Sequence, residues 1–202
     1  YTLLLSSFLW SEEVAKGNFL NFLSLQTFFS ASFKQTILRT GEKNTIEGNL
    51  HTTRAGKFRL VYKEPFSEII LSDGINLYRY DEELNQLDIQ PLENLLKENP
   101  IGLFSLELAD LETIFSLDSC MKDKNLLTCR ISMKGANEET LIKDLVITLR
   151  KNALFNVSYS DSLGQVVSLK FSDVSNDKIE DRMFQFVPPK GTDIIKHRNI
   201  LE

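Results

Sequence analysis

The sequence predicts a mainly β fold, in which one antiparallel sheet of about ten strands curls around an apolar hollow and two helical segments lie across its mouth. Apolar side chains alternate along much of the chain, which is typical of half-buried strands. Turn signals recur roughly every ten residues, a spacing that favours hairpins over βαβ units. Helical patterns are confined to two segments, too few to form a layer of their own.

Composition indicates one globular domain. The chain has 202 residues, 42% of them hydrophobic, with only 9 glycines and 5 prolines, and it is long enough for one substantial core. We find no repeat or linker that divides it. Its formal net charge of -5 and pI of about 5.2 argue against a nucleic-acid binder, which needs clustered lysine and arginine.

The first ten residues, YTLLLSSFLW, form an apolar segment. It is too short to cross a bilayer, which takes about 20 residues. Its length suits the remains of the apolar core of a signal peptide, although no basic segment precedes it and no A-x-A cleavage site follows. We therefore expect residues 1–10 to be a signal-peptide remnant and 11–202 to be a single domain. The alternative is that this segment is the first turn of a buried helix.

A helix is predicted from Ser11, which can cap it, and the acidic residues Glu12 and Glu13 suit its positive N-terminal end. Core-facing side chains then recur at steps of three and four, at Ala15, Phe19, Phe22, Leu23 and Gln26. From about Ala31 the period changes towards two, so the helix should give way to strands there.

Turn signals punctuate the next segment: TGEKN at 40–44, RAGK at 54–57, KEP at 63–65, SDG at 72–74 and DEELN at 81–85. They predict an antiparallel meander. Residues 92–115 interrupt it and read as one or two short helices broken at Pro100, because the residue before a proline avoids the helical conformation. Three hairpins follow, and a last strand is expected at RMFQFV, residues 182–187.

Cys120 and Cys129 flank a polar run, residues 122–125, that reads as a hairpin turn. In a hairpin centred on this run the two cysteines face each other. Directly opposite residues can lie about 4.5 Å apart, which is within disulfide range. The hairpin therefore allows a disulfide, and the alternative is two half-buried thiols.

In the stretch 48–62 most apolar side chains fall on even-numbered positions, and Arg54 also occupies an even-numbered position. Because strand side chains alternate between the two faces, Arg54 would share a face with these apolar residues. With a three-residue loop at 55–57, Arg54 would face Phe58 across the hairpin. A two-residue loop would instead place Arg54 opposite Lys57, an unfavourable like-charge pair. We therefore expect Arg54 on the apolar, concave face of the sheet near its rim.

A guanidinium in that place must find hydrogen-bond partners. Arginine offers five donors in a fixed fork, which suits carbonyl groups at an exposed helix end. The helix break at Pro100 supplies such carbonyls, so Arg54 is predicted to be a latch that holds residues 92–115 over the hollow. The alternative is an arginine at the end of a turn whose head reaches solvent.

No catalytic constellation is recognisable. An enzyme needs a nucleophile with a base, or a metal, and the chain has two histidines and no G-x-S-x-G motif. Neither His51 nor His197 lies at metal-ligand spacing from the cysteines. We therefore predict that the protein is not an enzyme and has no metal site and no cofactor.

The segments FSASFKQT at 29–36, GNLHTTRAGKFRLVYKEP at 48–65, ILSDGINLYRYDEELNQL at 70–87 and FVPPKGTDII at 186–195 together resemble one family. It is the family of periplasmic carriers of outer-membrane lipoproteins, often called LolA, and the resemblance covers nearly the whole chain. It implies an unclosed antiparallel β-barrel of about ten to eleven strands with a lid of short α-helices over an apolar cavity. A protein of this type shields the acyl chains of a lipoprotein during transfer across the periplasm.

By this resemblance, Arg54 matches the arginine whose hydrogen bonds to the lid backbone keep the empty cavity closed. Phe58 and Leu60 match wall positions of the cavity, and NPIGLFS at 99–105 matches the lid helix. The residues expected to line the acyl-chain cavity and its lid are Leu23, Leu50, Phe58, Leu60, Tyr62, Ile101, Leu103 and Phe104.

The resemblance also implies partners. These are acylated lipoproteins, an inner-membrane ABC transporter complex that releases them and, in many bacteria, an outer-membrane acceptor. The chain itself is expected to be a periplasmic monomer that uses no nucleotide.

Other classes of protein remain open at this stage. The shape of a hollow barrel does not identify the ligand that it binds. A lipocalin-like carrier of free fatty acid or another small apolar ligand is therefore the main alternative. A membrane-anchored acceptor of the same fold would need a lipid-modified cysteine near the N-terminus, whereas the first cysteine is Cys120. A purely structural adaptor would leave Arg54 exposed to solvent.

Overall fold

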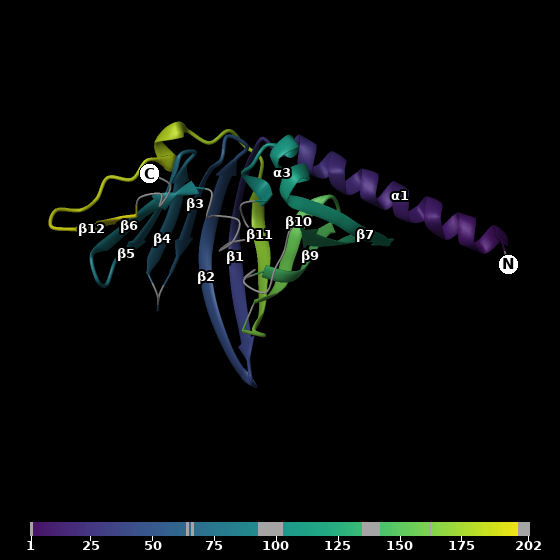
Figure 1. Cartoon of the computed structure of the whole chain (residues 1–202), viewed down its shortest axis with the longest axis horizontal. Coiled ribbons are helices and arrows are strands. Elements are labelled where there is room, and N and C mark those ends of the chain that lie inside the picture. The colour runs from purple at the N-terminus through teal and green to yellow at the C-terminus, as the bar shows by residue number, and fades with distance from the viewer. Residues whose placement is uncertain are drawn as a thin grey trace.

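The computed structural model describes residues 2–63, 65, 67–92, 103–134, 142–161 and 163–197, with the backbone alone for residues 2–10 and 108. Figure 1 shows one curled sheet, with the helix α1 (Thr2–Leu25) extending away at one end of it. A short helix, α3 (Leu108–Ile114), lies beside the C-terminal part of α1. The mainly β class predicted from the sequence is confirmed.

Within the described ranges, twelve strands form a single sheet in the order β12-β6-β5-β4-β3-β2-β1-β11-β10-β9-β8-β7. The two end strands of this order do not pair with each other, so the barrel is unclosed, as expected. The strands are β1 (Phe28–Arg39), β2 (Glu42–Thr53), β3 (Lys57–Tyr62), β4 (Glu68–Asp73), β5 (Asn76–Asp81), β6 (Gln86–Pro91), β7 (Phe115–Asp123), β8 (Leu126–Met133), β9 (Ile142–Arg150), β10 (Ala153–Asp161), β11 (Val166–Ser175) and β12 (Asp193–Lys196).

The first helix differs from the prediction at both ends. Ser11 does not cap it but lies inside it, because the leucine-rich segment before Ser11 contains no helix breaker and the helix continues through it. The helix ends at Leu25, and β1 begins at Phe28 rather than near Ala31. No helix in the described part of the chain is long and apolar enough to cross a membrane. The assignment of residues 1–10 to a signal peptide stays a prediction.

The end of the chain also corrects the prediction. Residues 182–187 are not a strand; the first three belong to a short 3-10 helix, η3 (Asp181–Phe184), in which Phe184 is buried, and Phe186 packs on a face of the sheet instead of pairing at an edge, while Val187 is exposed. The last strand is β12, which pairs with β6 in parallel, so the sheet is not wholly antiparallel. A parallel pair needs a long crossover, which the chain between these two strands provides.

The sheet is apolar on both faces, but in different places. The inner face, which packs against α1 and α3, bears the larger core cluster. Its alternating strand residues include Phe29, Ala31, Phe33, Leu50, Phe58, Leu60, Ile147, Val157, Leu169 and Phe171. The outer face is apolar over β4 to β6, where Ile69, Leu71 and Leu87 form a second cluster with Tyr80, and Phe186 covers it. The ring centroids of Tyr80 and Phe186 are 5.1 Å apart.

The hairpin of β2 and β3 has the expected loop length but a different register. Leu50 faces Leu60 and Thr52 faces Phe58, so the loop comprises residues 54–56 rather than 55–57. The reason is Gly56, whose φ of +72° is the left-handed conformation that a three-residue hairpin loop needs. Because side chains in strands alternate between faces, this shift of two pairing positions leaves the predicted inner-face residues on the same side.

The cysteine hairpin agrees with the sequence. Cys120 of β7 faces Cys129 of β8, and the two form a disulfide with their Cα atoms 4.1 Å apart. Both side chains belong to the inner-face core. The disulfide therefore ties the edge strand β7, on which α1 packs, to the rest of the sheet.

Loss of this disulfide should lower stability without changing the fold. We expect Cys120→Ala/Cys129→Ala to reduce the free energy of unfolding by about 2–4 kcal/mol, because the link no longer restricts the unfolded chain. Urea denaturation with and without a reductant checks this. Reductant should destabilise the wild type and leave the double variant unaffected; a wild type insensitive to reductant would contradict the expectation.

Gly48 of β2 lies between Phe33 of β1 and Tyr62 of β3. A Cβ atom there would lie 2.3 Å from Cζ of Phe33 and 2.3 Å from the carbonyl oxygen of Val61, and the second of these belongs to backbone that cannot move freely. The position therefore requires glycine for steric reasons.

We expect Gly48→Ala to destabilise the protein by about 1–3 kcal/mol through overpacking. The matched control is Gly17→Ala in α1, where a Cβ meets nothing within 4 Å, and we expect it to stabilise the protein by roughly 0.5–1 kcal/mol. Midpoints of urea denaturation measure both. Equal effects of the two substitutions would refute the steric account.

Candidate functional site

Arg54 lies in the loop between β2 and β3, and its side chain points into the protein. The residue is only 8% exposed, so the solvent-facing alternative is wrong. Its backbone N–H donates to the carbonyl oxygen of Thr27 at 3.2 Å, which holds the loop against the chain that follows α1.

The guanidinium of Arg54 joins two segments that are far apart in the sequence. On one side, Nε donates to the carbonyl oxygen of Gln26 at 2.8 Å and Nη2 donates to that of Leu23, at the C-terminal end of α1. On the other side, Nη1 donates to the carbonyl oxygens of Leu106 at 2.8 Å and Leu103 at 3.2 Å. One side chain thus links the end of the first helix to the segment before α3.

Two neighbours of Arg54 complete the contact. The hydroxyl of Thr52 donates to the carbonyl oxygen of Phe104 at 3.2 Å, and the backbone N–H of Gly56 donates to that of Ser105 at 2.9 Å. The four successive carbonyl groups of residues 103–106 therefore all accept a hydrogen bond from the β2–β3 hairpin. We call these hydrogen bonds and those of Arg54 to α1 the latch.

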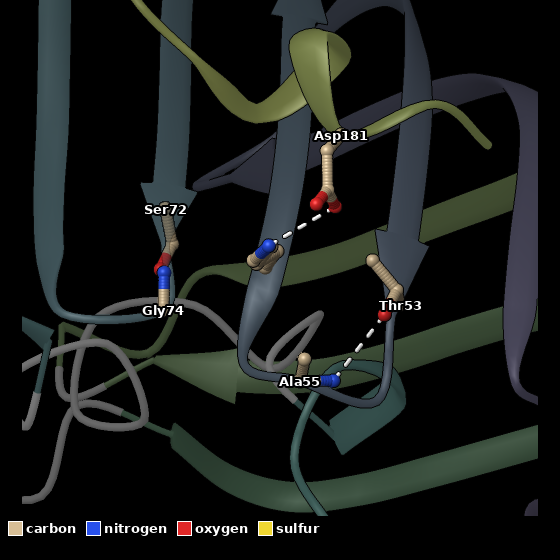
Figure 2. A network of polar contacts seen from close by, with 6 residues as sticks. Thr53, Ala55, Ser72, Gly74 and Asp181 are labelled. Carbon is tan, nitrogen blue, oxygen red and sulfur yellow. Dashed lines mark hydrogen bonds and ion pairs between the residues drawn. The ribbon is translucent and has the colours of Figure 1, made fainter.

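Neighbouring turns hold the latch loop in place. Figure 2 shows Thr53 accepting a hydrogen bond from the backbone N–H of Ala55, at 3.3 Å, with Ser72 and Gly74 of the adjacent turn nearby. The Ser72 hydroxyl donates to the carbonyl oxygen of Gly56 at 2.8 Å and accepts from the N–H of Gly74 at 3.1 Å. The loop is therefore a pre-formed donor surface rather than a mobile tip.

The charge of Arg54 is retained. Burial lowers the pKa of the guanidinium from its ordinary value and nearby Glu107 opposes this, but arginine starts so far above neutral pH that it stays protonated. Among the described residues, its side-chain hydrogen bonds all go to backbone carbonyl groups. Such charge-assisted bonds contribute about 1.5–3 kcal/mol each, and water can replace them when the segments separate.

The structure places the predicted cavity residues along the inner face and beneath the latch. Leu50, Phe58 and Leu60 are completely buried on β2 and β3. Leu23 of α1, Leu103 and Phe104 are buried in the covering segments, and Phe104 stacks on Phe29 with ring centroids 6.0 Å apart. Tyr62 lies at the opposite end of β3, edge-on to Phe33. Ile101 lies outside the described residues.

An apolar pocket of about 100 Å³ opens between α1, Leu103, α3 and β7. Of the predicted set, Leu23 and Leu103 border it, together with Phe19, Leu111 and Phe115. The sequence prediction missed Leu111 and Phe115, which continue the three-and-four spacing begun by Leu108. Ligand sites typically measure about 300–1,000 Å³, so this pocket is smaller than a typical ligand site.

Removal of the latch arginine should loosen the lid specifically. We expect Arg54→Leu to speed amide hydrogen exchange in residues 103–114 by at least about 30-fold, since losing about 2 kcal/mol of hydrogen bonding eases local opening. Arg59→Leu is the control, because Arg59 lies on the outer face and, within the described part of the chain, its side chain makes one long hydrogen bond, 3.5 Å, to the carbonyl oxygen of Met183. Unchanged exchange in 103–114 of Arg54→Leu would show that the lid closes by packing alone.

Comparisons with known proteins agree with this geometry. A family model described as outer membrane lipoprotein carrier protein LolA matches residues 24–187. A protein named outer-membrane lipoprotein carrier protein from Methylobacillus flagellatus is 30% identical over 181 residues, which covers 85% of this chain and 87% of that protein. One of the same name from Chromohalobacter salexigens is 29% identical over 173 residues, covering 84% of this chain and 81% of that protein.

Solved structures show the same fold at low sequence identity. An uncharacterized conserved protein from Thermus thermophilus aligns with a TM-score of 0.56 and 12% identity, over 91% of this chain and 99% of that one. A LolA superfamily protein from Nitrosomonas europaea aligns with a TM-score of 0.52 and 10% identity, over 85% of this chain and 97% of that one. Since the family model spans most of the chain, the resemblance noted in the sequence is confirmed: this chain belongs to the outer membrane lipoprotein carrier protein LolA family.

Proposed function

We propose that this protein is a periplasmic chaperone, which binds the acyl chains of lipoproteins released from the inner membrane and carries them to the outer membrane. The observation that carries the proposal is the latch. A buried arginine and its neighbours hold a lid over an apolar sheet face through bonds to backbone carbonyls alone. Such a lid can open without breaking the sheet beneath it.

Magnitudes support a reversible carrier. Each acyl CH₂ removed from water gains about 0.8 kcal/mol, so burial of ten such groups gains about 8 kcal/mol. Opening the latch loses several charge-assisted hydrogen bonds, each of which contributes about 1.5–3 kcal/mol after allowance for the hydrogen bonds that water then makes. The two quantities are of similar size, so cargo binding can drive opening and a partner can reverse it.

The proposed role also names the partners. Acylated lipoproteins are the cargo, an inner-membrane ABC transporter complex supplies it, and an outer-membrane acceptor receives it where the organism has one. The carrier works as a monomer and needs no catalytic group. A carrier of free fatty acid would use the same apolar face, but relatives with about 30% identity carry the lipoprotein-carrier name, which favours lipoprotein cargo.

A release assay tests the proposal. Spheroplasts that hold a newly made lipoprotein are incubated with purified protein, and soluble complex is counted by pull-down. We expect wild type to release acylated cargo and not a non-acylated version. Arg54→Leu should bind cargo but pass less of it to acceptor membranes, because the lid no longer recloses to displace the acyl chains.

Arg59→Leu serves as the control in this assay and should transfer cargo like wild type. Wild-type protein that releases no lipoprotein yet binds free fatty acid would overturn the lipoprotein assignment. In that case the small-ligand carrier becomes the better account.

A further inference from the structure

The inner face carries polar side chains at the end of β3 that lies away from the latch. Tyr62 is the last residue of β3, whereas the latch loop precedes the first residue of that strand. The Tyr62 ring packs edge-on against Phe33 with centroids 5.5 Å apart, and its hydroxyl donates to Oε1 of Gln35 at 3.1 Å. A phenol and an amide therefore interrupt the apolar surface of β1 to β3 here, and Ile37 follows farther along β1.

Tyr159 of β10 joins this end of the inner face from the other side of the curled sheet. It packs against the inner-face core and lies near enough to Tyr62 to affect its titration. Its hydroxyl has no hydrogen-bond partner among the described residues, and the side chain is partly exposed. Burial and the neighbouring Asp161 raise the pKa of Tyr159 to about 12, so the hydroxyl stays protonated and able to donate.

A charged pair borders the two phenols. Glu68 begins β4 beside the end of β3, and it forms an ion pair with Arg79 of β5. Burial, with Tyr159 and Glu68 nearby, raises the pKa of Tyr62 above its usual range, and Arg79 opposes this. We call Gln35, Tyr62, Glu68, Arg79 and Tyr159 the polar rim.

The apolar stretch between the latch and the polar rim has the length of an acyl chain. Phe29 stacks on Phe104 beneath the latch, and Gln35 lies six residues farther along the same strand, which corresponds to about 20 Å. One leaflet of a bilayer has a hydrocarbon thickness of about 15 Å, half of the whole core. A fatty chain laid along the inner face therefore reaches from one end to the other.

We propose that the polar rim binds the polar end of the cargo lipid, through its ester and amide carbonyl groups, while the acyl chains lie along the inner face towards the latch. This inference rests on the proposed carrier function. Carbonyl oxygens accept hydrogen bonds and do not donate, and the rim offers the donors they need in the Tyr159 phenol and the NH₂ group of the Gln35 amide, which Tyr62 orients by donating to Oε1 of Gln35. In the closed structure the donors at the latch end are occupied by the lid backbone and by the end of α1.

The rim should therefore distinguish lipoprotein lipid from free fatty acid. Binding is measured by displacement of a fluorescent fatty acid, with two probes: a lipopeptide whose N-terminal cysteine carries two palmitoyl esters, and palmitate, which has no ester or amide. The variants are Tyr159→Phe, Tyr62→Phe and the double variant. Tyr80→Phe is the matched control, because its hydroxyl bonds Asn85 and the ring lies on the outer face.

We expect the loss of each rim hydroxyl to weaken binding of the lipopeptide roughly fivefold, so that the double variant binds it about 25-fold more weakly than wild type does. Palmitate presents one carboxylate in place of several ester and amide carbonyl groups, so the double variant should weaken its binding by no more than about fivefold, and Tyr80→Phe should change neither affinity. Tyr159→Phe alone is informative if Tyr62→Phe folds poorly, because its hydroxyl has no described protein partner to lose.

Two results would overturn the inference in different ways. In the first, wild type binds the lipopeptide, and the rim variants either weaken binding of both probes equally or weaken binding of neither. The polar rim then does not bind the polar end of the lipid, and the carrier function stands. If wild type binds palmitate and not the lipopeptide, the carrier function fails and the rim inference fails with it.

Discussion

The contact between the Arg54 loop and the backbone of residues 103–106 is the interaction on which the functional arrangement depends. It joins the end of α1, the segment before α3 and the β2–β3 hairpin at one point. A buried guanidinium is tolerated there because its N–H groups donate to several backbone carbonyl groups, which replace the hydrogen bonds that water would make. The use of a charged side chain and backbone carbonyl groups also makes the contact reversible, since water solvates both readily once the segments separate.

The outer face of the sheet contributes a cluster that stabilises the fold, whereas the inner face is the one that the lid covers. Over β4 to β6 the outer face has its own apolar cluster, covered by Phe186. That part of the sheet therefore does not rely on the lid for its packing. The inner face instead packs against α1 and the segment that includes Phe104, which the latch secures. Movement of the lid would then expose the inner face while the outer cluster stays intact, as a carrier that opens and closes requires.

Polarity along the inner face gives the proposed cargo a direction. Beneath the latch the surface is made of Phe29, Phe58 and Leu60, while the other end carries Tyr62 and Tyr159. An amphiphile lying between them is most stable with its chains under the lid and its polar head at the phenols, because buried polar groups need partners and apolar groups do not. The same sheet thereby discriminates between the two ends of one ligand.

Local chemistry in the sequence by itself determined the alternating strands, the turns, the facing cysteines and the burial of Arg54, since each follows from side-chain period or turn preference within a few residues. It predicted the right loop length but missed the loop register, because the left-handed conformation of Gly56 places the three-residue loop at 54–56, a position that the charge argument at Lys57 did not test. Only the tertiary structure decided that Phe186 covers a sheet face and that β12 pairs with β6 in parallel. It also decided which carbonyls Arg54 reaches, because partners 28 to 52 residues away are brought together only by the folded sheet.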